Sequence, residues 1–93
     1  MRLEIISPEA TLYQGEATAV TVPGVEGSFQ ILERHASIAS VLQKGALIVK
    51  GLNRQLLASS HAANFQTNAD ETSLLIQGGA VEMKNNKLIV LID

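Results

Sequence analysis

The chain has 93 residues, a formal net charge of −2 at pH 7 and no cysteine. The length fits one domain, and the lack of cysteine excludes disulfide bonds, thiolate catalysis and cysteine metal sites. Seven basic residues, one tyrosine and two phenylalanines supply neither the basic face nor the stacking platforms of a nucleic-acid binder. No apolar run reaches the roughly 18 residues that a membrane-spanning helix needs.

The N-terminal third is predicted to contain a first strand and then a hairpin. Residues 2–5 and 18–22 alternate apolar and polar side chains, which is the period-2 pattern of half-buried strands. Pro23 and Gly24 are predicted to end the second strand and to reverse the chain, because proline lacks a backbone N–H and glycine accepts the positive φ of a type II turn. Residues 29–32 then restore the alternation and complete the hairpin.

The middle of the chain has one clear strand signal and one ambiguous segment. Residues 46–50 are apolar on both faces, which favours a separate, well-covered strand after a break at Lys44 and Gly45. Residues 52–72 are compatible with a strand extended into a longer hairpin or loop, and also with a short helix. The strand and loop interpretation is favoured, because the helical pattern is short and has no clear N-cap.

The C-terminal third carries a strong hairpin signal. Asn85 and Asn86 tolerate the positive φ of a two-residue turn between two alternating segments. Gly78 and Gly79 precede that hairpin and are expected to let the strand bend or another backbone approach closely. With eight to ten short strands at close spacing, the chain is predicted to be all-β. We expect one domain, residues 1–93, folded as a two-layer antiparallel β-sandwich or flattened barrel.

The sequence predicts no catalytic, metal or cofactor site. His35 and His61 lie 26 positions apart, and neither has further ligands at metal-binding spacing. The chain contains no G-x-S-x-G nucleophile motif. The glycines at 24 and 27 are not followed by the Lys-Ser/Thr pair of a phosphate-binding loop. We therefore expect a non-catalytic protein.

Three ordered blocks resemble a known family. They are ISPE at 6–9 with LYQGE at 12–16, VPGVEGSFQIL at 22–32 with HA at 35–36, and GGAVE at 78–82 with NKLIVL at 86–91. Together they are similar to the epsilon subunit of rotary F-type ATP synthases, which is called delta in mitochondria. The chain departs from this pattern at Ser37, where the family usually has proline, and in the longer segment 52–72.

The resemblance implies a rotor subunit of the central stalk that couples the gamma shaft to the membrane c-ring of a proton-translocating synthase. It implies a place at the cytoplasmic face of the bacterial membrane, reached only through the complex, and an isolated chain that is monomeric or weakly associated. The expected contacts with gamma are His35, Ala36, Ser37 and Ile38. The expected contacts with the c-ring are Glu26, Gly27 and Ser28.

Many members of this family continue into a helical hairpin that inhibits ATP hydrolysis and in some cases binds ATP. Since the present chain stops after its last predicted strand, we expect a short form without that brake or nucleotide site. An alternative from another class is a free-standing β-sandwich adaptor or ligand-binding module. An enclosed apolar pocket would favour that alternative.

Overall fold

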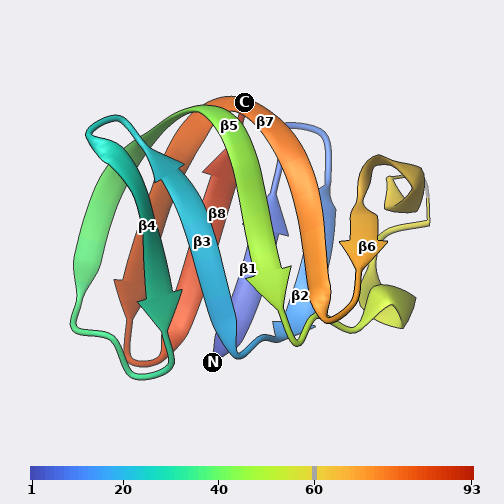
Figure 1. Ribbon diagram of the computed structural model, residues 1–93, viewed down its shortest axis with the longest axis horizontal. Coiled ribbons are helices and arrows are strands. Elements are labelled where there is room, and N and C mark those ends of the chain that lie inside the picture. Colours follow the sequence, from blue (N-terminus) through green and yellow to red (C-terminus); the bar gives the residue numbers. More distant parts are fainter. Residues whose placement is uncertain (60) are drawn as a thin grey trace.

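A computed structural model describes residues 1–59 and 61–93, and these residues form eight strands and two short 3-10 helices (Figure 1). The strands before the helices are β1 Arg2–Ile6, β2 Thr11–Glu16, β3 Ala19–Gly24, β4 Gly27–Leu32 and β5 Ile38–Lys50. The helices η1 Arg54–Leu56 and η2 Ala62–Asn64 follow, and then β6 Gln66–Asn68, β7 Glu71–Lys84 and β8 Lys87–Ile92.

All strands belong to one sheet with the order β2-β1-β8-β7-β5-β3-β4, and β6 pairs with β7 outside this path. The sheet folds over on itself into two layers, which confirms the predicted β-sandwich (Figure 1). The expectation of purely antiparallel pairing is wrong for one pair, because β1 runs parallel to β8. Parallel neighbours need a long crossover connection, and the rest of the chain provides it between the first and the last strand.

Two long strands make the corner between the layers. β5 has 13 residues and β7 has 14, and Figure 1 shows both ribbons arching from one layer into the other. The inward-facing residues of β5 change from even to odd positions along the strand, since Leu42 is buried in the first half and Leu47 and Val49 are buried in the second. A bend of this kind lets one strand serve both layers. The prediction of a separate strand at residues 46–50, and of short strands throughout, is therefore wrong here.

The hairpin of β3 and β4 differs from its predicted form. Pro23 and Gly24 are the last residues of β3 and pair with Ser28 and Gly27, so Val25 and Glu26 make the reversal. The pairing of β3 with β5 shifts register between Thr21 and Gly24, and the missing N–H of Pro23 is not required at such an irregularity. Gly24 keeps a negative φ, so it does not take the type II position that we expected.

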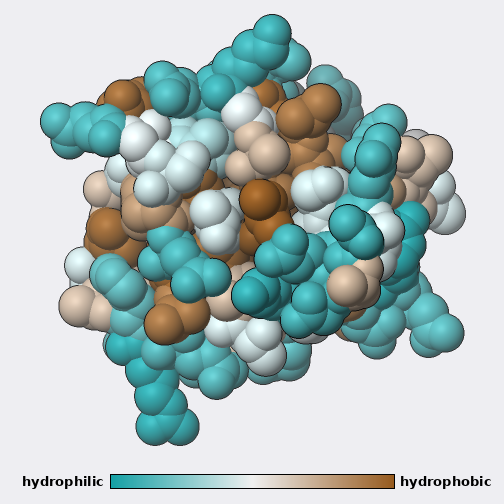
Figure 2. Space-filling model, in the orientation of Figure 1, coloured by the Kyte–Doolittle hydropathy of each residue, from teal (hydrophilic) through white to brown (hydrophobic). Residues whose placement is uncertain are grey.

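The core lies between the two layers and contains alternate side chains of most strands. The largest fully buried side chains are Tyr13, Met1, Leu3, Ile5, Ile31, Leu47, Met83, Leu88, Val20, Val22, Val49 and Val90. The outer face over β3, β4 and β5 shows apolar side chains scattered among polar ones, with polar side chains gathered toward its edges (Figure 2). The apolar material that stabilises the fold is therefore mostly inside, as expected for alternating strands.

The ambiguous segment 52–72 contains both kinds of structure, although residue 60 lies outside the described part. It forms η1 and η2, followed by the three-residue strand β6. Leu57 and Phe65 bury their side chains in the core, and the N–H of Ala58 donates to the carbonyl of Leu12 on β2. The Arg54 guanidinium donates to the carbonyls of Phe65 and Ala62 and to a threonine hydroxyl. The segment therefore packs beside β2 and fills one end of the sandwich.

An ion pair joins the parallel strands β1 and β8. Lys87 Nζ lies 3.2 Å from Glu4 Oε2, and the lysine is the main cause that lowers the pKa of the Glu4 carboxyl. A carboxyl whose pKa is lower in the folded state stabilises the fold above its unfolded pKa, and that stabilisation is lost as the pH falls through the folded pKa.

Glu4→Gln is therefore expected to lower the melting temperature at pH 7. The difference in melting temperature from wild type should shrink as the pH falls below about 4.5, the ordinary pKa of a glutamate carboxyl. Thermal unfolding of both proteins between pH 7 and pH 3 measures this difference. A deficit that stays constant over this range would show that the ion pair does not contribute as stated.

Candidate functional site

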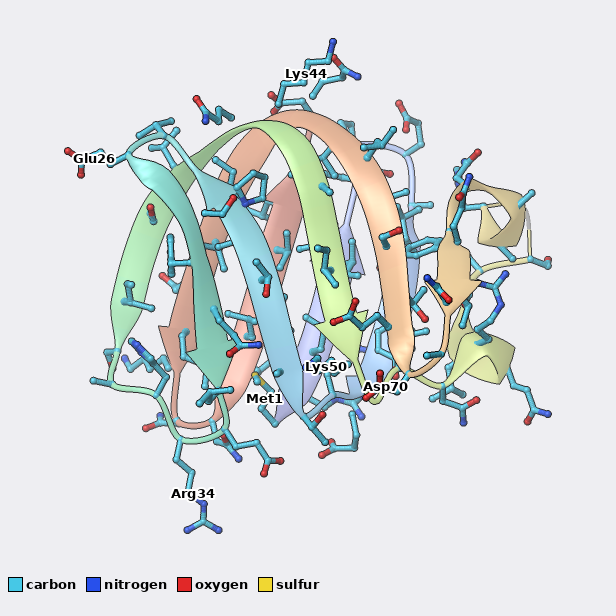
Figure 3. All side chains as sticks on the ribbon, viewed as in Figure 1. Met1, Glu26, Arg34, Lys44, Lys50 and Asp70 are labelled. Atoms are coloured by element: carbon cyan, nitrogen blue, oxygen red, sulfur yellow. The ribbon has the colours of Figure 1, made fainter. Side chains whose placement is uncertain are left out.

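The tip of the β3–β4 hairpin projects from one end of the molecule. Glu26, Gly27 and Ser28 are exposed, and Figure 3 shows the Glu26 side chain pointing away from the body. The tip is tied to the sandwich by a hydrogen bond of 3.2 Å from the N–H of Val25 to the carbonyl of Val41 on β5. The three residues expected to contact the c-ring therefore form one continuous exposed stretch, with Glu26 in the turn and Gly27 and Ser28 at the start of β4.

Residues 33–37, named here the His35 corner, connect β4 to β5 and are all exposed. The N–H of His35 donates to the carbonyl of Leu32 at 3.2 Å, which closes a turn, and His35 Nδ1 lies 2.8 Å from the carbonyl of Ala36. Arg34 has a φ of 64°, in the left-handed region. The expected gamma contacts thus lie in this corner, except Ile38, which is half-buried at the start of β5.

The corner is hydrogen-bonded to two other parts of the chain. The α-ammonium of Met1 donates to Glu33 Oε1 at 2.6 Å, and this contact is the main cause that lowers the pKa of the Glu33 carboxyl. The N–H of Arg34 donates to Asn86 Oδ1 at 2.7 Å. Asn85 and Asn86, with φ values of 54° and 59°, form the two-residue turn between β7 and β8.

The tip and the His35 corner lie at opposite ends of β4. Glu26 and Arg34 mark these two ends in Figure 3 and point away from each other. Since β4 has six residues and a strand rises about 3.4 Å per residue, the two loops are separated by roughly 20 Å. The structure therefore keeps the two predicted contact sites apart, as two surfaces rather than one.

An apolar groove, which the sequence analysis missed, lies on the outer face of β1, β5, β7 and β8, and along β5 it extends from Ala39 to Val41, whose carbonyl accepts the Val25 N–H beside the hairpin tip. It has a volume of about 670 Å³, and Val41 and Leu91 are 62% and 49% exposed there. Its apolar lining residues include Ile6, Ala39, Val41, Ala80, Ile89 and Leu91. Contiguous exposed apolar surface of this kind marks an interaction site more often than scattered single residues do.

A sequence signal for the groove exists in the last strand. Residues 88–92 of β8 are apolar on both faces, with Leu88 and Val90 buried and Leu91 exposed. A strand that is apolar on both faces is normally covered on both. The outward residues Ile89 and Leu91 of this strand are therefore the part of the sequence that indicates a groove on this face.

Neither a metal centre nor a membrane-spanning helix is found in residues 1–59 and 61–93. No three His, Asp or Glu side chains of these residues lie close enough together to hold a metal ion. No helix in the same part of the chain has the length and apolar character needed to cross a membrane.

Comparison with known proteins gives consistent results. The family model for the ATP synthase Delta/Epsilon chain, beta-sandwich domain, matches residues 1–64. An ATP synthase epsilon chain of Sulfurimonas denitrificans is 32% identical over 93 residues, which cover 100% of this chain and 60% of the relative. One from Leptospira interrogans is 35% identical over 94 aligned positions, covering 100% of this chain and 61% of that protein.

Solved structures show the same fold at lower identity. A chain in the central stalk and c-ring structure of the Tetrahymena thermophila mitochondrial ATP synthase superposes with a TM-score of 0.68 at 18% identity, covering 99% of this chain and 62% of that one. A chain of the Euglena gracilis mitochondrial ATP synthase superposes with a TM-score of 0.71 at 16% identity, covering 97% of this chain and 48% of that one.

The present chain spans about 60% of the length of the curated relatives it matches. The family model covers more than half of the chain, and two relatives align along all of it. The chain therefore belongs to the delta/epsilon chains of ATP synthase, and its residues form their β-sandwich domain.

Proposed function

We propose that the chain is a non-catalytic central-stalk component of a bacterial F-type ATP synthase, where it couples the gamma shaft to the c-ring at the cytoplasmic face of the membrane. The observation that carries the proposal is the match to epsilon chains over the full length of the sequence. The fold adds support, because it presents two exposed loops at opposite ends of one edge strand. A connector between two partners requires two separate surfaces.

The gamma contact is assigned to the His35 corner together with the apolar groove. β5 begins at Ile38, directly after the corner, and continues through Ala39 and Val41 into the groove. The corner supplies polar and charged groups at the rim, while Val41 and Leu91 supply apolar area. An apolar centre with a polar rim is the usual composition of a protein interface.

The c-ring contact is assigned to the hairpin tip at Glu26, Gly27 and Ser28. The loop is polar and exposed, which suits contact with the polar loops of a membrane-embedded ring rather than with lipid. The hydrogen bond from the Val25 N–H to the Val41 carbonyl fastens the tip to β5. The groove residue Val41 therefore also supports the tip, so the two proposed contacts adjoin at this point of β5.

A coupling element must transmit force without deforming. β4 pairs along its full length with β3, from Gly24 with Gly27 to Ala19 with Leu32. Its inward side chain Ile31 is fully buried in the core. Close-packed interiors have low compressibility, so a ladder anchored to such a core carries displacement from one loop to the other.

The double variant His35→Ala with Ile38→Asp is expected to weaken binding to the gamma subunit by about tenfold or more, the range of an interface hot spot. Both changes lie in the proposed contact, and Ile38 is only half-buried in the free chain, so the fold should persist. Affinity measured by titration against purified gamma subunit, with circular dichroism of the free variant, checks both points.

The matched control changes the other end of β4. Glu26→Ala with Ser28→Ala should leave the affinity for gamma within about twofold of wild type and should reduce retention on a c-ring instead. Unchanged gamma binding by the corner variant would remove the assignment of this contact. Failure of the wild-type chain to bind either partner would remove the proposed function.

A further inference from the structure

We propose that Asn86 is a positioning residue for the gamma-binding corner, because its side chain holds Arg34 in the left-handed conformation that shapes the loop. The inference rests on the proposed function for the identity of the partner. Its structural part concerns this chain alone.

The conformation of Arg34 requires an explanation. A φ of 64° is disfavoured for any residue with a Cβ, and asparagine, aspartate and glycine tolerate it better than arginine. The guanidinium does not account for it, because Figure 3 shows this side chain extending away from the molecule. The N–H of Arg34 instead donates to Asn86 Oδ1 at 2.7 Å, a bond between residues 52 positions apart.

Asn86 is well placed to act as a fixed support. It occupies the two-residue turn between β7 and β8 with a φ of 59°, which asparagine adopts readily. Its carbonyl accepts the N–H of Arg2 on β1 at 3.0 Å. The residue is thus anchored by three strands of one layer, so its side chain presents the amide oxygen at a defined position.

The corner has little else to hold it. Its five residues are exposed, so no buried side chain anchors them. Among the described residues, the Asn86 bond and the contact of Glu33 with the Met1 ammonium are the side-chain hydrogen bonds that link the corner to other elements. Ser37, whose φ is not fixed by a ring, adds no restraint of its own. Without Asn86 the loop would gain conformers, and binding gamma would then cost more ordering entropy.

Two substitutions at one position separate the side-chain bond from the turn. Asn86→Gly removes the amide oxygen but keeps the turn, because Asn-Gly is a preferred pair for a two-residue hairpin loop. Asn86→Asp keeps an acceptor oxygen and tolerates positive φ. Loss of order at residues 34–36 in Asn86→Gly but not in Asn86→Asp therefore reports the hydrogen bond to Arg34.

The experiment measures amide order parameters and hydrogen exchange of residues 34–36 by NMR in the free chain. Wild type and Asn86→Asp are expected to be ordered, with order parameters of about 0.85 at these residues. In Asn86→Gly the order parameters should fall below about 0.6, and the Arg34 amide should lose its protection from exchange. The melting temperature of Asn86→Gly should change little. Its affinity for gamma should fall about three- to tenfold, and adding Ser37→Pro should restore part of it, because proline fixes φ.

Each outcome decides one of the two statements. Equal order and exchange in wild type and Asn86→Gly would overturn the positioning role, and so would a loosened corner that still binds gamma with wild-type affinity. If the wild-type chain does not bind gamma, the proposed function fails, and the NMR comparison still decides whether Asn86 holds the corner.

Discussion

Replacing Gly79 with alanine is expected to destabilise the fold by roughly 2 to 6 kcal/mol, since it combines overpacking with backbone strain. A Cβ on this residue would collide with the carbonyl oxygen of Leu91 and lie 3.1 Å from the Cα of Ile92, both on β8. The φ of Gly79 is 154°, a conformation that residues with side chains rarely adopt. A domain of this size has about 5 to 14 kcal/mol of stability, so the loss is a large fraction of the total.

Gly27→Ala is the matched control for the steric part of this effect. Gly27 also has a positive φ, 122°, but a Cβ there would meet no atom within 4 Å. Only the backbone penalty remains, about 1 to 3 kcal/mol. Urea unfolding curves with unchanged slope give both values. Equal losses in the two variants would show that the close approach of β7 and β8 at Gly79 is not what requires glycine.

The strand pattern was predictable from sequence wherever one face of a strand is buried. Leu3 and Ile5, Val20 and Val22, and the Asn85-Asn86 turn lie in the expected elements because alternation and turn chemistry are local properties. The parallel pairing of β1 with β8 was not predictable in this way. It joins the two ends of the chain, and no local pattern records which strands become neighbours.

The prediction was wrong where a glycine or a proline lies inside a strand instead of ending it. The sequence pattern predicts a break at Gly45, yet this residue lies inside β5, and a Cβ there would come 2.8 Å from Cβ of Pro23. The glycine makes room for a neighbouring strand rather than for a turn. Pro23 likewise remains in β3, because it sits where the pairing with β5 is irregular. Both residues report tertiary packing, which single-sequence reasoning does not see.

The candidate sites were only partly accessible to sequence reasoning. The tip and the His35 corner could be named because they resemble family motifs, and both are exposed loops in the structure. The groove is assembled from β1, β5, β7 and β8, and its residues are brought together only by the sheet order. The Asn86 bond to Arg34 also spans 52 positions. Features of this kind need the fold before they can be recognised.

Val41→Asp is expected to weaken binding to the gamma subunit by about a hundredfold while leaving the free chain folded. Val41 is 62% exposed, so aspartate is solvated in the free chain, and surface changes of this kind typically alter stability by less than about 0.5 kcal/mol. In the proposed complex the same carboxylate would be covered in the apolar groove, whose own lining residues include no cationic side chain. Burying an unpaired charge is strongly unfavourable, and a hundredfold change corresponds to about 2.7 kcal/mol.

The control is Leu75, a second exposed apolar side chain that lies outside the groove. Leu75 is 78% exposed on β7 but pairs opposite Ala46, in the half of the sandwich that does not line the groove. Leu75→Asp makes the same change in charge, so it should bind gamma as wild type does. Titration of both variants against the gamma subunit at one salt concentration makes the comparison. Wild-type affinity in Val41→Asp would exclude the groove from the contact, and an equal loss in both variants would mean that overall charge, rather than the groove, governs binding.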